Sequence, residues 1–153
     1  MDILKDVKKY YLSKIVLLDY CGHHNQGNFK MSEKSEEFLK VMLKFIPSLN
    51  REYKKSIEDN GEILDTVIIE DVFMPEIIKL LSEETNINLL KRIFDYFEEV
   101  SNCEDSYLQN IFTVTVLEIL GNDRTILGIA KKYMGPKTTQ LQVQADIDLG
   151  RTL

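Results

Sequence analysis

Residues 106–120 have the sequence SYLQNIFTVTVLEIL, which is apolar on nearly every side when wound as a helix. A helix that is hydrophobic all round is stable only when its whole surface is buried. We therefore expect this segment to be the central buried helix of the fold. Asn110 lies within it and would need a hydrogen-bonding partner in the core.

The segment that precedes this helix in the chain also shows helical spacing of its apolar residues, with Gly and Pro between the runs. A helix is predicted to begin after Ser32 or Ser35 and to close at Pro47. Pro47 can open a second, short helix, because proline is favoured in the first turn. Asn60 and Gly61 then predict its end.

The carboxy-terminal half has equally clear helix boundaries. Asn86 or Asn88 is expected to cap the helix that follows it. Gly121 predicts a helix end and Asp123 the cap of the next helix. A Gly-Pro step at residues 135–136 ends that helix and starts the last one.

The segment at residues 63–73 is less certain in type. Its apolar spacing favours a helix, although the run Val67, Ile68 and Ile69 would also suit a strand. Pro75 is predicted to break this element.

Together these patterns predict an all-α fold. Helices joined by short turns are expected to lie antiparallel, as αα-hairpins stacked in one irregular, HEAT-like array without a clean sequence repeat. A chain of 153 residues, 44% of them hydrophobic, suits one cooperative core, so residues 1–153 are expected to form a single helical domain. Residues 1–31 would supply an amino-terminal amphipathic helix and a polar loop.

Negative charge is concentrated in the middle of the chain. Residues 58–84 hold nine acids and one base, a net charge of minus eight, whereas the whole chain is minus six. A sequence pI near 5.0 argues against a nucleic-acid partner, because phosphate binding requires clustered Lys and Arg. Any partner is therefore expected to be basic.

The apolar runs are too short to cross a bilayer, and residues 1–14 alternate charged and apolar positions instead of forming a signal-peptide core. We expect a cytoplasmic protein with no membrane partner. Cys21, His23 and His24 form the only cluster of soft metal ligands, but adjacent His residues converge poorly on one ion, so an exposed loop is expected instead of a metal site.

No pattern of catalytic residues, phosphate-binding loop or cofactor motif is found. Acid pairs such as Glu70-Asp71 are more typical of a solvated helix face than of an acid-base pair. We therefore expect neither enzymatic activity nor a cofactor.

Two blocks of the sequence are similar to a known family. SEEFLKVMLKFIPSLNREYKKSIEDNGEILDTVIIEDV (35–72) has the helix ending in an Ile-Pro step, the charged helix, the Asn-Gly-Glu turn and the apolar run of a small helical bacterial family. YLQNIFTVTVLEIL (107–120), followed by AKKYMGPKTT (130–139), resembles the carboxy-terminal half of that family, with its Asn in the buried helix and its Met-Gly-Pro turn. The resemblance runs from Ser32 to about Leu141 and leaves residues 1–31 outside.

Such proteins are encoded beside polymorphic or contact-dependent toxins, so the resemblance implies an immunity protein that binds a cognate toxin domain. Many toxin domains are nucleases and therefore basic, which would give the acidic segment a role in steering and binding. The expected partner-binding residues are Glu62, Asp65, Glu70, Asp71 and Glu76. Two alternatives stay open: the acids serve solubility alone, or the chain is a non-enzymatic helical adaptor for another cytoplasmic protein.

Overall fold

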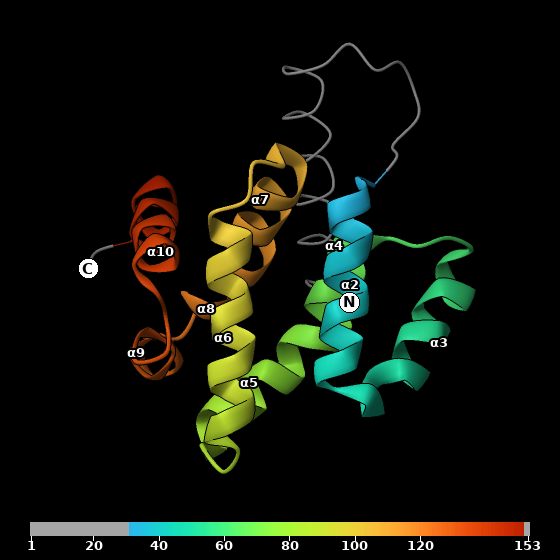
Figure 1. The fold of residues 1–153 in the computed structure, drawn as a ribbon, viewed down its shortest axis with the longest axis horizontal. Coiled ribbons are helices and arrows are strands. Elements are labelled where there is room, and N and C mark those ends of the chain that lie inside the picture. Colours follow the sequence, from blue (N-terminus) through green and yellow to red (C-terminus); the bar gives the residue numbers. More distant parts are fainter. Residues whose placement is uncertain (1–30, 152–153) are drawn as a thin grey trace.

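The computed structural model describes residues 31–151, and every regular element in that range is helical, which confirms the all-α prediction. The α-helices, labelled as in Figure 1, are α2 (Glu33–Phe45), α3 (Asn50–Asn60), α4 (Asp65–Ile68), α5 (Met74–Glu83), α6 (Ile87–Ser101), α7 (Ser106–Phe112), α8 (Glu118–Leu120), α9 (Arg124–Lys131) and α10 (Pro136–Asp148). A 3-10 turn, Pro47–Leu49, precedes α3. Two π-helical turns, Ile69–Phe73 and Thr113–Leu117, join α4 to α5 and α7 to α8.

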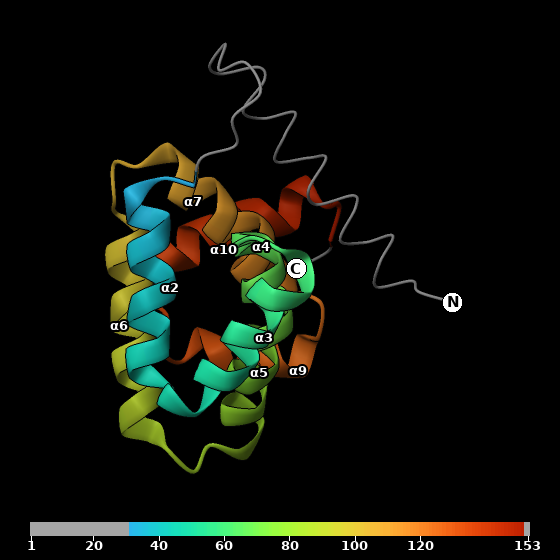
Figure 2. The same ribbon diagram turned by 90° about the vertical axis from the view of Figure 1, so that its right-hand side faces the viewer.

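Helices α2 and α6 lie side by side and run in opposite directions (Figures 1 and 2). The last helix, α10, runs across the direction of α6 (Figure 2), and it packs on α6 and on the second π-helical turn. Helix α9 packs on α5. The carboxy-terminal helix α10 therefore departs from the antiparallel arrangement of α2 and α6.

The sequence left two choices of helix start, Ser32 or Ser35 and Asn86 or Asn88, and the structure decides both. Ser32 caps α2 by accepting a hydrogen bond from the Ser35 amide at 3.1 Å, and Asn86 caps α6. Asp123 caps α9 as predicted. Gly61 ends α3 with a φ of 72°, a left-handed conformation that favours glycine.

Pro75 does not break the helix that contains it, so that prediction was wrong. Residues 65–83 are helical throughout, and we call them helix 65–83. Directly before the proline, the amide of Met74 donates to the carbonyl of Ile69, five residues back, and so widens the turn. The wider turn lets the chain pass a residue that has no amide hydrogen and would crowd the preceding turn of an α-helix.

The segment 106–120 is one helix that runs through the second π-helical turn, and we call it helix 106–120. It is central as predicted, and it is almost fully buried from Val114 onward. The expectation for Asn110 was wrong, because its side chain is exposed. In the first turns only Leu108, Ile111 and Phe112 face the core, so the other side of the helix meets solvent.

Aromatic rings join the central helix to its neighbours within one continuous hydrophobic core. Phe97 on α6 lies between Phe94 and Phe112, with ring centroids 5.1 Å and 5.2 Å away. Phe38 on α2 packs on Phe97 and on Phe112 at 6.4 Å and 6.3 Å. Phe97 and Phe112 are fully buried, and α2, α6 and helix 106–120 share one aromatic cluster.

Candidate functional site

The five acidic residues expected to bind a partner do not all face solvent. Glu62, in the turn after α3, and Asp71, in the first π-helical turn, are exposed, and Glu76 on α5 is half-buried. Glu70 is also half-buried, and one of its carboxylate oxygens is fully enclosed. The exposed acids of this set are therefore Glu62 and Asp71, with Glu76 partly accessible.

Asp65 is a buried residue, so the prediction that it lines a solvent-facing surface was wrong. It is 8% exposed and stands at the start of α4, where donors from three helices converge on its carboxylate. Ser35 of α2 donates through its hydroxyl at 3.1 Å, Tyr107 of α7 at 2.9 Å, and the Thr66 amide at 2.8 Å. Burial raises the pKa of Asp65, and these hydrogen bonds oppose the rise. Asp65 thus holds α2, α4 and α7 together.

Helix α3 and the turn that follows it form the most open part of the acidic segment. No residue of α3 is buried, and Tyr53 and Ile57 pack only partly on the core. Glu58 and Asp59, at its end, are exposed, as is Glu62 in the turn. Ile63 stands among these acids with 40% of its surface exposed. We call Glu58, Asp59, Glu62 and Ile63 the acidic turn.

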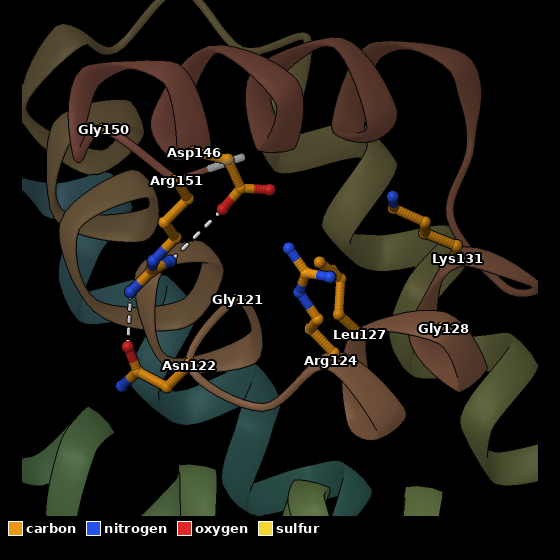
Figure 3. Close-up of a pocket in the computed structure, with 9 residues that line it drawn as sticks. All are labelled: Gly121, Asn122, Arg124, Leu127, Gly128, Lys131, Asp146, Gly150 and Arg151. Carbon is orange, nitrogen blue, oxygen red and sulfur yellow. Dashed lines mark hydrogen bonds and ion pairs between the residues drawn. The ribbon is translucent and has the colours of Figure 1, made fainter. Parts of the chain in front are cut away.

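A second feature is a pocket of about 500 Å³ between α9 and the end of α10 (Figure 3). Most of the side chains that line it are either small or basic. They come from the turn before α9, from α9 itself, and from the end of α10 with the segment that follows it. The lining residues are Gly121, Asn122, Arg124, Leu127, Gly128, Lys131, Asp146, Gly150 and Arg151. Three of them are cationic and one is anionic, in a chain whose net charge is minus six. The pocket is therefore a basic site on an acidic protein.

One wall of the pocket is held rigidly by Asp146 and Arg151. Arg151 donates to the Asp146 carboxylate at 3.2 Å and to the carbonyl of Glu118 at 3.1 Å, and it also binds the side chain of Asn122 (Figure 3). The buried Gln142 amide adds a hydrogen bond to Asp146 at 3.2 Å. Asp146 is thus neutralised by Arg151, and the guanidinium fastens the end of the chain to the turn before α9.

The opposite wall is one face of α9. Arg124, Gly128 and Lys131 are spaced i, i+4 and i+7, which places them in a row on that face. Both long side chains project from α9 toward α10, one on each side of the bare backbone of Gly128 (Figure 3). A Cβ added at Gly128 would meet nothing within 4 Å, so no packing contact in the fold requires glycine there.

Comparison with known proteins places the chain in a family. Residues 39–148, well over half of the sequence, match the family described as Domain of unknown function (DUF7674). The chain belongs to the DUF7674 family. No curated protein and no solved structure matches it. The DUF7674 region includes the acidic turn, Asp65 and the α9 face of the pocket, whereas Arg151 lies just after it.

Sequence reasoning missed the pocket of this DUF7674 protein. It used Gly121 and Asp123 for helix boundaries and gave no role to the side chains of the helix that Asp123 caps. The available signal was glycine in the middle of a short helix, flanked at helical spacing by Arg124 and Lys131. The contribution of Arg151 has no local signal, because the fold alone brings it to α9.

The structure describes only part of the chain in which a metal site or a membrane-spanning helix was considered. Cys21, His23 and His24 lie outside them. Within residues 31–151, no three His, Cys, Asp or Glu side chains are grouped as a metal site would need. None of the helices in that range has the length and apolar character to span a bilayer.

Proposed function

We propose that this protein binds another protein without catalysis, as an immunity protein that neutralises a cognate bacterial toxin domain in the cytoplasm. The observation that carries the binding proposal is helix α3 with the acidic turn: a charged helix without a buried residue, followed by a turn in which an exposed isoleucine comes directly after three exposed acids in the sequence. The toxin as partner is supported by the resemblance of residues 35–72, 107–120 and 130–139 to immunity proteins.

The chemistry of the acidic turn suits a basic protein surface. Exposed carboxylates speed the encounter with a cationic partner through long-range attraction, and this effect weakens with salt. An apolar side chain within such a rim can supply the desolvated centre that protein interfaces require. We assign the centre to Ile63 and the rim to Glu58, Asp59 and Glu62. Asp71 and Glu76, on helix 65–83, are the other accessible acids among the five residues expected to bind a partner.

Asp65 has no place in this interface, because its carboxylate is used inside the fold. Glu70 is a poor candidate for charge reversal, since a lysine there would have to bury part of its side chain. The proposed interface therefore loses Asp65 and Glu70 from the five residues expected from the sequence and gains Glu58, Asp59 and Ile63.

The first test is calorimetric binding to the carboxy-terminal domain encoded by the gene immediately upstream, at two salt concentrations. We expect nanomolar affinity at low salt and weaker binding at high salt. Absence of binding would reject the toxin domain as partner and favour an adaptor that uses the same surface for another cytoplasmic protein.

Charge reversal locates the contact surface. The double variant Asp59→Lys, Glu62→Lys should slow association and flatten its salt dependence, while the thermal melt stays nearly unchanged because both side chains are exposed. Asp95→Lys, Glu99→Lys is the matched control, since it makes the same change in net charge at two exposed acids of α6, outside the acidic turn. An equal effect of the control would mean that only net charge matters and that the acidic turn is not the interface.

Ile63→Ser tests the apolar centre separately. Loss of a desolvated anchor should mainly speed dissociation of the complex, whereas loss of rim charges should mainly slow association. A dissociation rate equal to that of the unaltered protein would remove Ile63 from the interface.

A further inference from the structure

We propose that the outer face of α2 and α6 binds a second copy of this chain in a two-fold symmetric dimer. We call this surface the α2–α6 face, and its members are Glu37, Val41, Lys44, Arg92, Tyr96 and Glu99. It uses other residues than the acidic turn, so the proposal stands independently of the proposed toxin binding. Three properties carry it: accessibility, the order of the charges and a half-buried apolar centre.

The charged members of the α2–α6 face are accessible. Figure 2 shows α2 and α6 together along one edge of the described structure. Glu37 and Lys44 on α2 are exposed, and so are Arg92 and Glu99 on α6. All four side chains can therefore meet another molecule without a change in the fold.

Tyr96 fixes the level at which the two helices meet. Its ring stacks on Phe38 with the centroids 5.8 Å apart and meets the ring of Phe45 edge-on at 5.9 Å. These two partners are seven residues apart on α2, so Tyr96 lies level with the midpoint between them. That midpoint is at Val41.

The two helices carry their charges in opposite order. On α2 the acid Glu37 comes seven residues before Lys44, whereas on α6 Arg92 comes seven residues before the acid Glu99. Residues at this spacing lie on one side of a helix, about 10.5 Å apart. Because α2 and α6 are antiparallel, both acids lie at one end of the face and both bases at the other. Burial raises the pKa of Tyr96, and the carboxylates of Glu37 and Glu99 raise it further, as expected for two acids on the same side of its ring.

The charges of the α2–α6 face do not neutralise one another within one chain. Within residues 31–151, Lys44, Arg92 and Glu99 form no ion pair, and Glu37 pairs at 3.2 Å with Lys34, an exposed neighbour on the same helix. Such an exposed pair contributes little to stability and can exchange for another partner. A surface that places bases opposite the acids, and acids opposite the bases, would balance both ends of the face.

A second copy of the chain provides that surface. A two-fold axis that lies in the interface and runs across both helices packs each helix antiparallel on its own counterpart. Glu37 then faces the partner's Lys44, and Glu99 faces the partner's Arg92. Because the contact is symmetric, each of these pairs forms twice, and no like charges of the two ends meet.

Val41 and Tyr96 form the centre of the face. Each lies four residues after the first charge of its helix and three before the second, so each stands in the same row as those charges. Both are half-buried, and the two-fold axis brings each opposite its counterpart in the partner. Lys40 and Asp95, the exposed charges nearest this level, have opposite signs, so the centre carries no net charge. Aromatic and apolar side chains within a charged rim are the usual arrangement of a protein interface.

The test is sedimentation equilibrium of the full chain over a range of concentrations at low and at high salt. We expect a monomer–dimer equilibrium at micromolar concentration, with a weaker dimer at high salt. The double variant Glu37→Lys, Glu99→Lys should raise the dimer dissociation constant about tenfold or more, because bases would then face bases. Lys44→Glu, Arg92→Glu should do the same, because acids would face acids.

Mixing these two double variants gives the sharpest check. One then has a wholly basic face and the other a wholly acidic face, so a heterodimer should form more tightly than either variant binds itself. The matched control is Asp59→Lys, Glu62→Lys, which changes the net charge as much as Glu37→Lys, Glu99→Lys does but within the acidic turn. Its dimer should be retained.

Several results would overturn the proposal. One is a chain that stays monomeric at millimolar concentration. Another is a dimer that both face variants leave intact, or a failure of the two variants to associate when mixed while circular dichroism shows that they are folded. A monomeric chain whose face variants lose toxin binding would assign the face to the toxin. Loss of toxin binding in the acidic-turn variant, with its dimer retained, would instead show that the two surfaces are separate.

Discussion

Glu98 caps a helix to which it does not belong. Its carboxylate, on α6, accepts hydrogen bonds from the Thr138 amide at 2.8 Å, the Thr138 hydroxyl at 2.9 Å and the Lys137 amide at 3.0 Å. These amides lie in the first turn of α10, where backbone donors have no partner within the helix. Gly135, at the cap position, has no side chain to serve them. One carboxylate therefore both caps α10 and fastens it to α6.

Glu98→Ala should destabilise the protein by about 1–2 kcal/mol, which is the usual cost of losing an N-terminal cap. Burial raises the pKa of Glu98, but the hydrogen bonds from Thr138 and Lys137 outweigh it, and the net shift is downward from 4.5. A lowered pKa means that the stabilisation is present above that value and is lost as the pH falls through the pKa of the folded state. Chemical denaturation of both proteins at pH 7 and below pH 4 measures the effect.

Gly135→Ala should act through the same cap. The added methyl group would lie 2.5 Å from Cδ of Glu98 and push the carboxylate off the amides of α10. The double variant with Glu98→Ala should then lose less stability than the sum of the two single variants, because both remove one interaction. Strict additivity would show that the methyl group is accommodated without displacing Glu98.

Asp65 should make stability depend on pH in the opposite sense to Glu98. Its pKa is raised above 3.8 by burial, so the folded protein takes up a proton at a pH where the unfolded chain does not. As the pH falls from neutral toward 3.8, the unaltered protein should therefore gain stability relative to Asp65→Asn. Urea denaturation of both proteins at several pH values measures this difference.

Gly128→Ala should stabilise the protein by about 1 kcal/mol, because alanine is the better helix former and its methyl group meets open space. Gly121→Ala should destabilise it, since the methyl group would lie 2.6 Å from Asp146 and crowd the Arg151 contacts. Thermal melts of the two variants check both signs. A lower melting temperature for Gly128→Ala would mean that the glycine has a structural role.

Phe97→Ala should cost about 3–5 kcal/mol, the usual range for emptying a buried aromatic site. The ring is fully enclosed and touches Phe94, Phe112 and Phe38. Phe45→Ala is the comparison, because that ring is only half-buried and should cost clearly less. Equal losses of unfolding free energy would contradict a core centred on Phe97.

Helix boundaries were the most predictable part of the fold, because each depends on a few residues that are adjacent in the sequence. Ser32, Asp123 and the Gly-Pro step at 135–136 act within one turn of the chain. Polar contacts between residues far apart in the sequence could not be predicted in this way. The Glu98 cap on α10 joins residues 39 and 40 positions apart, and neither partner is unusual in its own neighbourhood.

The candidate sites show the same division. The concentration of acids in residues 58–84 can be counted in the sequence. Which of these acids are buried and which are exposed depends on how the helices pack. Asp65 has the same local surroundings as other acids of the segment, and its burial depends on Ser35 and Tyr107, which are 30 and 42 residues away. The pocket requires Arg151 to return to the turn at Asn122.

The two π-helical turns lie against each other in the middle of the fold. Each contains one residue more than an α-helix would use for the same turn. Removal of a single residue from Thr113–Leu117 should therefore restore an ordinary α-helical turn and leave Leu120 facing the core. Removal of a residue from an α-helical stretch such as Ser106–Phe112 would instead rotate the chain that follows by about 100°. The second π-helical turn is thus a position where helix 106–120 can lose a residue without changing the face that α9 presents to α10.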